Sequence, residues 1–279
     1  MPPRLSDIHR TAFITGASTG LGHAFTTMLL AEGVRVWGTS RDPARLAGLA
    51  AAAPGKFTPV ALELGDGDAA EAAFRAADAA AGGFDLVINN AGYGVFAEFA
   101  GADFVVWQDQ IQVMLVNTAR LSHAALRVFR ARPAHRGTLV NISSLAAEFP
   151  LPFQSAYNVC KAGLSALNES LITETAGSGI VVIDFRPGDY RTAFDGSVQR
   201  PQTVMTPTMR RAWTAFEGLM RSGPAPEGAA EALRRALFRG RSGTVRTGRF
   251  FQATLAPFLA RFGSQGLQRR IRARYFDLS

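Results

Sequence analysis

Short apolar runs alternate with amphipathic stretches along most of the chain. The stretches have helical spacing and fall at residues 20–32, 43–52, 67–81, 102–131, 154–176 and 226–239. The apolar runs have the length of strands and fall at 11–15, 34–39, 57–62, 84–89, 136–142 and 180–186, with a shorter one at 244–247. Strands that alternate with helices are typical of a parallel sheet covered on both faces. We therefore predict a doubly wound, Rossmann-like α/β fold of about seven strands.

Length and composition agree with one such unit over residues 1–279. The chain is 47% apolar, enough to bury a sizeable core, and α/β folds of this size are commonly single domains. Residues 1–10 lack an apolar segment, and no run of about 18 apolar residues occurs, so we predict neither a signal peptide nor a membrane span. The single cysteine, Cys160, cannot form an internal disulfide, which favours a cytoplasmic protein.

Three glycines follow the first predicted strand and precede the first predicted helix. They are Gly16, Gly20 and Gly22. Glycines in this context let the backbone approach a dinucleotide pyrophosphate, which the N-terminus of the helix then binds. The spacing differs from the commoner G-x-G-x-x-G pattern, and a structural tight turn is the competing interpretation.

A tyrosine and a lysine stand four residues apart in a predicted helix. Tyr157 and Lys161 therefore lie on one face of that helix, and Ser144 precedes the tyrosine by thirteen residues. A nearby cation favours the phenolate and lowers the pKa of a phenol from its usual value of about 10. A hydroxyl, a phenol and an ammonium can together move a proton, although an ordinary surface pair is the plainer interpretation.

Taken together, these motifs resemble the short-chain dehydrogenase/reductase family. The matching segments are Thr15-Gly16-Ala17-Ser18-Thr19-Gly20-Leu21-Gly22, Asn89-Asn90-Ala91-Gly92, Asn117, Ser144, Tyr157, Lys161 and Pro187-Gly188. They occur in the family's order and spacing from about residue 10 to about 195. The resemblance implies an oxidoreductase that uses a nicotinamide cofactor, acts on a small molecule, contains no metal and forms a homodimer or homotetramer.

The resemblance also implies roles for four catalytic residues. Tyr157 would give a proton to the substrate carbonyl oxygen or take one in reverse, and Lys161 would lower the tyrosine pKa and bind the nicotinamide ribose. Ser144 would donate a hydrogen bond to the same oxygen. Asn117 would hold a water that links Lys161 to solvent. Ser143 competes with Ser144, and the thirteen-residue spacing favours Ser144.

A second set of residues would hold the cofactor. It comprises Gly16, Ser18, Thr19, Gly20, Leu21 and Gly22 at the glycine turn, Ser40, Arg41, Glu63, Leu64, Asn90, Ala91 and Gly92 on the adenosine side, and Tyr157, Lys161, Pro187, Gly188 and Thr192 around the nicotinamide. Glu63 departs from the aspartate that the family usually carries at the adenine.

The end of the second predicted strand bears on the choice of cofactor. An acidic residue there binds the ribose hydroxyls of NAD and repels the 2′-phosphate of NADP. This chain has Ser40 and Arg41 instead, and a guanidinium can bind a phosphate with two hydrogen bonds. Asp42 follows, and we interpret it as the N-cap of a helix that begins at Pro43. We therefore favour NADP(H) over NAD(H).

The segment 189–225 falls where the family carries a substrate lid and is rich in apolar residues. It indicates a bulky apolar ketone or alcohol, although an apolar helix face that packs on the core gives the same pattern. We predict an NADPH-dependent carbonyl reductase or alcohol dehydrogenase. A non-redox step such as epimerisation or dehydration, and an NADP(H)-binding sensor without turnover, remain the alternatives.

Positive charge is concentrated near the C-terminus. Residues 234–279 hold eleven arginines and one acidic residue, Asp277, while the rest of the chain holds 19 basic and 21 acidic residues. From about residue 250 to 279 these arginines interleave with apolar residues. Such a tail can lie on an anionic membrane surface, or cover the pocket or an oligomer interface. We favour the last two, and expect no nucleic-acid binding because no binding module is present.

Overall fold

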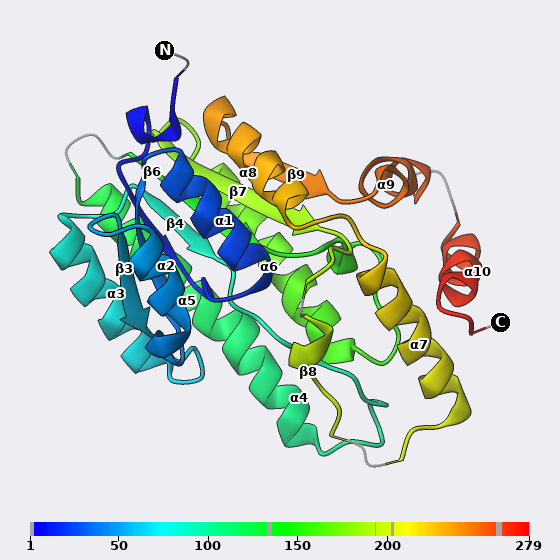
Figure 1. Cartoon of the computed structure of the whole chain (residues 1–279). Helices are drawn as coiled ribbons and strands as arrows, with labels where there is room; N and C mark the ends of the chain where they lie inside the picture. Colours follow the sequence, from blue (N-terminus) through cyan, green and yellow to red (C-terminus); the bar gives the residue numbers. More distant parts are fainter. Residues whose placement is uncertain (1–2, 133–135, 193, 202–203, 261–263, 279) are drawn as a thin grey trace.

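Seven parallel strands form the central sheet of the computed structural model, which describes residues 3–132, 136–192, 194–201, 204–260 and 264–278. Their order across the sheet is β3-β2-β1-β4-β6-β7-β9 (Figure 1). The strands are β1 (Thr11–Ile14), β2 (Arg35–Ser40), β3 (Phe57–Ala61), β4 (Leu86–Asn89), β6 (Gly137–Ile142), β7 (Ile180–Pro187) and β9 (Gly243–Thr247). The predicted doubly wound fold is confirmed, and each predicted strand is present.

Helices cover both faces of the sheet. On one face lie α1 (Gly20–Ala31), α2 (Ala47–Ala52) and α8 (Glu227–Arg239), and on the other lie α3 (Gly67–Ala81), α5 (Thr118–Arg130) and α6 (Ser155–Glu174). Each layer buries its own apolar cluster. Phe25 of α1 packs against the first face, and Phe74 and Phe129 against the second, all fully buried. The sheet is apolar on both faces, as expected for parallel strands under helices.

Two predicted helices are interrupted. The stretch 102–131 forms α4 (Phe104–Ile111), a π-helical segment (Gln112–Asn117) and α5, so its middle turns are wider than an α-helix. The stretch 43–52 begins with a 3-10 turn (Pro43–Leu46) before α2. There the Asp42 side chain accepts a hydrogen bond from the Ala44 N–H at 3.0 Å, which confirms Asp42 as the N-cap.

Several elements have no counterpart among the predicted ones. They are α7 (Pro207–Arg221), the two-stranded pair β5 (Gly94–Val95) and β8 (Val198–Gln199), the tail elements Phe251–Leu255 (π-helical), α9 (Ala256–Ala260) and α10 (Gln265–Tyr275), and the 3-10 turns Leu5–Asp7, Leu145–Ala147 and Asp195–Ser197. The predicted lid and tail also contain residues 193, 202–203, 261–263 and 279, which lie outside the described residues. Across the described helices, none is both long and apolar enough to cross a membrane.

Candidate active site

A cavity of about 1430 Å³ opens at the carboxyl ends of the central strands. Its walls come from the turns after β1, β2, β4, β6 and β7, together with the lid helix α7 and the tail elements. Parallel strands bring their carboxyl ends to one edge of a sheet, which is why residues so distant in sequence meet here. The volume exceeds that of a typical pocket for one small ligand, about 300–1,000 Å³.

The glycine turn forms one wall of the cavity and has no room for side chains. Gly16 and Gly20 have φ angles of +71° and +57°, which disfavour other residues. A Cβ atom on Gly22 would lie 2.1 Å from the Gly16 carbonyl oxygen. The side-chain amide of Asn90 donates to the Thr15 carbonyl at 2.9 Å and fixes the turn to β4. Because α1 begins at Gly20, its unpaired N–H groups face the cavity, as a pyrophosphate requires.

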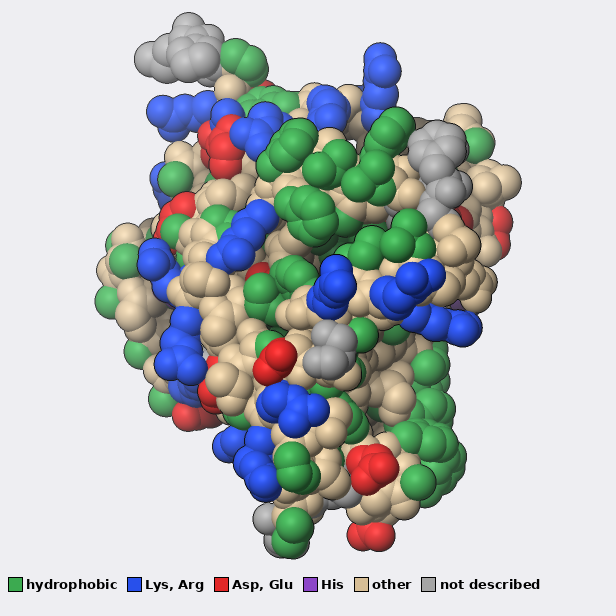
Figure 2. Space-filling model, turned by 90° about the vertical axis from the view of Figure 1, so that its right-hand side faces the viewer, with side chains coloured by type: hydrophobic (Ala, Val, Ile, Leu, Met, Phe, Trp, Pro, Cys, Tyr) green, Lys and Arg blue, Asp and Glu red, His purple; other side chains and the backbone are tan. Residues whose placement is uncertain are grey.

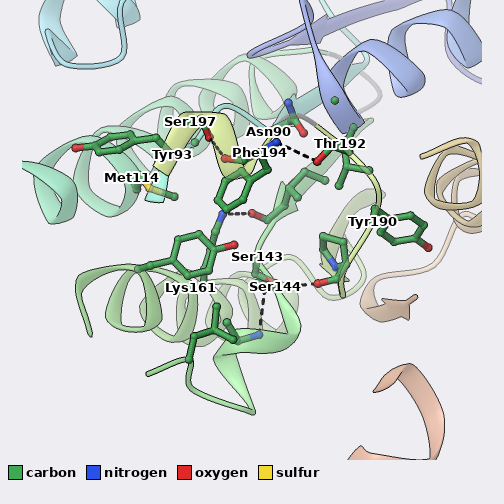
Figure 3. A pocket seen from close by; sticks show the side chains of 18 of the residues that line it. Asn90, Tyr93, Met114, Ser143, Ser144, Lys161, Tyr190, Thr192, Phe194 and Ser197 are labelled. Carbon is green, nitrogen blue, oxygen red and sulfur yellow. Dashed lines mark hydrogen bonds between the residues drawn. The ribbon is translucent and has the colours of Figure 1, made fainter. Parts of the chain in front are cut away.

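Ser144, Tyr157 and Lys161 converge on the cavity wall below this turn. Ser144 follows β6, and its hydroxyl lies 3.5 Å from the Pro187 carbonyl oxygen (Figure 3). The Lys161 ammonium donates to the Ile142 carbonyl at 2.7 Å and lies 5.6 Å from the centre of the Tyr157 ring. All three groups therefore border the same space.

The neighbouring hydroxyl of Ser143 points elsewhere. It donates to the buried carboxylate of Asp184, and Ser143 itself is fully buried. That carboxylate also accepts hydrogen bonds from Asn168 at 3.1 Å and from Arg186 at 2.7 Å. Ser143 thus anchors the loop after β6, while Ser144 is left at the cavity. The choice of Ser144 from the thirteen-residue spacing agrees with this geometry.

Burial governs the pKa values of the tyrosine and the lysine. It raises the pKa of Tyr157 to about 12, although an interaction with the Ser144 side chain acts in the opposite direction. Burial also lowers the pKa of Lys161 to about 8. The expectation that Lys161 holds the pKa of Tyr157 below its usual value is wrong for this structure. The ammonium donates to a backbone carbonyl, and removal of the phenol from water is the largest influence on the pKa of Tyr157.

Asn117 lies outside the cavity, contrary to its predicted role beside Lys161. Its side-chain amide donates to the Leu64 carbonyl at 2.7 Å and accepts from Gln112 at 2.9 Å. Met114 lines the cavity instead and packs in one apolar cluster with Tyr157 (Figure 3). Both residues belong to the π-helical segment, from which Met114 borders the cavity and Asn117 braces the loop after β3.

Replacing Asn117 by alanine is therefore expected to destabilise the protein rather than disable it. The substitution leaves the Leu64 carbonyl without its donor, which costs about 1–3 kcal/mol in the free energy of unfolding. Urea unfolding measures this loss, and the turnover of the folded variant is expected to stay close to that of the wild type. A variant of unchanged stability whose turnover has collapsed would restore the catalytic interpretation of Asn117.

The residues after β2 reach the far end of the cavity. Ser40, Arg41 and Glu63 line it as predicted, and the Arg41 guanidinium lies 3.9 Å from the Glu63 carboxylate at the exposed rim. Arg45 also lines this end and was not predicted. The predicted N-cap at Asp42 could have indicated this residue. A helical turn that begins at Pro43 places Arg45 near Arg41, at the same end of the cavity.

The remaining predicted cofactor residues line the same cavity. They are Ser18, Thr19, Leu21, Leu64, Ala91, Gly92, Pro187, Gly188 and Thr192. Thr192 packs over the glycine turn, where its Cβ would lie 3.5 Å from a Cβ on Gly20. Tyr190, for which no role was predicted, also borders the cavity, and its hydroxyl lies 2.5 Å from that of Thr247.

Apolar side chains enclose the outer half of the cavity. Phe194 lies over Tyr157, with 5.9 Å between the ring centres. The lid helix α7 adds Phe216 and Met220, the loop after Ser144 adds Phe149 and Leu151, and the tail adds Phe251, Leu259, Leu267, Ile271 and Phe276. The sequence allowed three positions for the tail: over the pocket, at an oligomer interface or on a membrane surface. Its described residues do border the cavity.

Polar contacts fasten the tail next to the loop after β7. The side-chain amide of Gln252 lies 2.5 Å from both the Asp189 carboxylate and the Tyr275 hydroxyl. Burial raises the pKa values of Asp189 and Tyr275, the latter to about 12. The Arg249 guanidinium, just before the tail, donates a hydrogen bond to the Ser222 hydroxyl at 2.8 Å and so connects this segment to the end of α7. Lid and tail thus close the cavity as connected pieces.

Comparison with known proteins identifies the family. The model of the short chain dehydrogenase family matches residues 10–203. An uncharacterized oxidoreductase of Myxococcus xanthus is 33% identical over 216 residues, 76% of this chain and 85% of that protein. A probable NADP-dependent dehydrogenase of Haemophilus influenzae is 30% identical over 179 residues, 64% of this chain and 70% of that protein.

A solved structure agrees with the sequence comparisons. The crystal structure of a short-chain dehydrogenase from Streptomyces avermitilis superimposes with a TM-score of 0.82 at 29% identity, and the match covers 92% of this chain and 94% of that one. The sheet and the site thus define an oxidoreductase of the Rossmann type. The chain belongs to the short chain dehydrogenase family.

Proposed function

We propose that the protein is an NADPH-dependent carbonyl reductase or alcohol dehydrogenase, which interconverts a bulky apolar ketone and its secondary alcohol. One observation carries the proposal: Ser144, Tyr157 and Lys161 border the cavity between the glycine turn and an apolar outer compartment. A carbonyl group held there would meet a proton donor on one side and a nicotinamide on the other. The oligomeric state, the cytoplasmic location and the single-domain organisation stay predictions.

The cavity fits a dinucleotide because its glycine turn excludes side chains where a pyrophosphate would lie. Gly16, Gly20 and Gly22 would hold the pyrophosphate, and Asn90 keeps their turn in place. Pro187 and Gly188 would border the nicotinamide, which supplies or accepts the hydride when it is bound.

Tyr157 moves the proton in this proposal. With a pKa of about 12 its phenol is protonated at neutral pH and can donate to a ketone oxygen. The Ser144 hydroxyl lies beside it and can donate a second hydrogen bond as negative charge develops on that oxygen. The Lys161 ammonium stabilises the phenolate that remains after the proton has left.

Arg41 and Arg45 support the choice of NADP(H). Both guanidinium groups reach the cavity end that the adenosine ribose would occupy, and Ser40 adds a hydroxyl. The one acidic residue near them among those that line this end, Glu63, is 3.9 Å from Arg41 and accepts a hydrogen bond from the Gly65 N–H at 3.0 Å. A 2′-phosphate would find two cations here. The similar protein from Haemophilus influenzae is named NADP-dependent as well.

The pH dependence of ketone reduction follows from the lysine. Because burial lowers the pKa of Lys161 to about 8, its ammonium is lost as the pH rises through that value, well before Tyr157 deprotonates. We expect kcat/KM for the ketone to be highest below pH 8 and to fall above it. Steady-state rates between about pH 6 and 10 test this, and a rate that stays constant until about pH 10 would contradict it.

The substrate class is tested with a panel of ketones. Nicotinamide absorbance is followed while aromatic, steroidal and long-chain ketones are compared with short polar ones. Since the outer compartment is lined by Phe149, Phe194 and Phe216, we expect turnover to increase with the apolar surface of the ketone. Equal or faster turnover of the short polar ketones would overturn the apolar assignment.

A further inference from the structure

Large apolar side chains lie exposed on the tail. Phe250 is 74% exposed and Ile271 is 51% exposed, although apolar side chains of this size are normally buried. We define the tail face as these two residues with Phe251, Leu255, Leu259 and Leu267. Figure 2 shows this side of the molecule, where hydrophobic side chains gather with Lys and Arg side chains beside them. Exposed clusters of this kind mark interaction surfaces.

The charge beside the tail face is positive and uncompensated. Arg269, Arg270 and Arg274 of α10 form no ion pair with an acidic side chain in the part of the chain that the structure describes. In the tail itself, residues 250–279, five arginines stand against one acidic residue, Asp277, which gives a net charge of +4. A partner for this surface must therefore be apolar and negatively charged.

A second copy of the chain could supply an apolar surface but not a negatively charged one. Pairing through the tail face would bring two segments of net positive charge together, which costs free energy at close range. An anionic phospholipid surface meets both requirements, since acyl chains accept the apolar side chains and headgroups attract the arginines. We propose that the tail face docks the protein onto an anionic phospholipid bilayer.

Docking in this way would turn the cavity toward the lipid. Leu259, Leu267 and Ile271 belong to the tail face and also line the cavity. Its mouth would then lie at the boundary of headgroups and acyl chains. A ketone or alcohol dissolved in the bilayer would reach Tyr157 without crossing water. This step rests on the proposed function, whereas the docking itself does not.

Vesicle flotation tests the docking without any substrate. The full chain is expected to float with phosphatidylserine-containing vesicles, less so at higher salt, and not with pure phosphatidylcholine vesicles. In a Phe250→Ser variant and an Arg269→Gln/Arg270→Gln variant, binding is expected to weaken by about 10- to 30-fold. None of these three side chains lines the cavity, so cofactor binding checks their folding.

Matched substitutions elsewhere provide the controls. Phe104 on α4 is 61% exposed, and Arg127 and Arg130 on α5 are exposed arginines. Phe104→Ser and Arg127→Gln/Arg130→Gln are expected to float like the wild type. Wild-type protein that stays unbound at low salt, or tail variants that float as well as it does, would overturn the docking. Sedimentation that shows a dimer dissociated by Phe250→Ser would overturn it too, in favour of a second copy.

Access from the bilayer has its own measurement. A long-chain ketone dissolved in phosphatidylserine vesicles is expected to be reduced about tenfold faster than in phosphatidylcholine vesicles, and the Arg269→Gln/Arg270→Gln variant is expected to lose this difference. A short water-soluble ketone serves as the control. If neither ketone is reduced, the proposed function fails. If only the short ketone is reduced, or the lipid makes no difference, the inference about access fails.

Discussion

Replacing Tyr157 by phenylalanine is expected to lower ketone turnover by about 10²- to 10⁴-fold, the usual contribution of a general acid. The substitution removes one hydroxyl from a side chain that is otherwise buried against Phe194 and Met114, so the packing of the site should persist. NADPH binding, measured by fluorescence titration, is expected to change little. Steady-state turnover measures the loss.

Tyr93 provides the matched control for this experiment. It lines the same cavity, but it follows the turn after β4 and lies beside Met114 rather than Ser144 (Figure 3). A Tyr93→Phe variant removes a phenol hydroxyl from the cavity without touching the proposed proton donor, and is expected to retain most of the turnover. Turnover in Tyr157→Phe within about tenfold of the wild type would remove the tyrosine from the mechanism.

Replacing Arg41 by alanine is expected to raise the KM for NADPH by about 10- to 100-fold, while the KM for NADH changes little. The reason is that a hydrogen bond between a guanidinium and a phosphate joins two charged groups, and NADH lacks the 2′-phosphate. An Arg45→Ala variant is expected to show a smaller change in the same direction. Steady-state kinetics with each cofactor measure both.

The control for Arg41 is Arg127→Ala, which removes an exposed arginine that does not line the cavity and should leave both KM values unchanged. It separates the local contact from the general attraction of a basic protein for an anionic cofactor. Equal increases of the KM for NADPH and NADH in Arg41→Ala would contradict the assignment to the 2′-phosphate, and with it the preference for NADP(H).

Local patterns were enough to predict the sheet and the core of the site. Each strand is a short apolar run between polar turns, and the parallel order brings Gly16, Ser144 and Pro187 to one edge without further information. The four-residue interval between Tyr157 and Lys161 fixes their common face because α6 is regular throughout. Asp42 was likewise predictable, since a cap depends only on its own neighbours.

Asn117 shows where local patterns fail. Its role was predicted from the resemblance to the family, whereas in the structure Asn117 lies in a π-helical segment and its side-chain amide bonds the loop after β3. The spacing of apolar residues does not indicate that Met114, rather than the side-chain amide of Asn117, packs beside Tyr157. The pKa values were missed for a related reason. Burial of Tyr157 depends on Phe194 and Met114, whose positions follow from tertiary packing.

Transfer of deuterium from NADPH deuterated at the reactive carbon of the nicotinamide tests the central claim most directly. Wild-type protein is incubated with this cofactor and the panel of apolar ketones, and the products are analysed by mass spectrometry, with Tyr157→Phe in parallel. We expect the wild type to form an alcohol that carries one deuterium on the former carbonyl carbon, and Tyr157→Phe to form almost none. A product without deuterium, or equal labelling by the two proteins, would contradict a reductase that works through Tyr157.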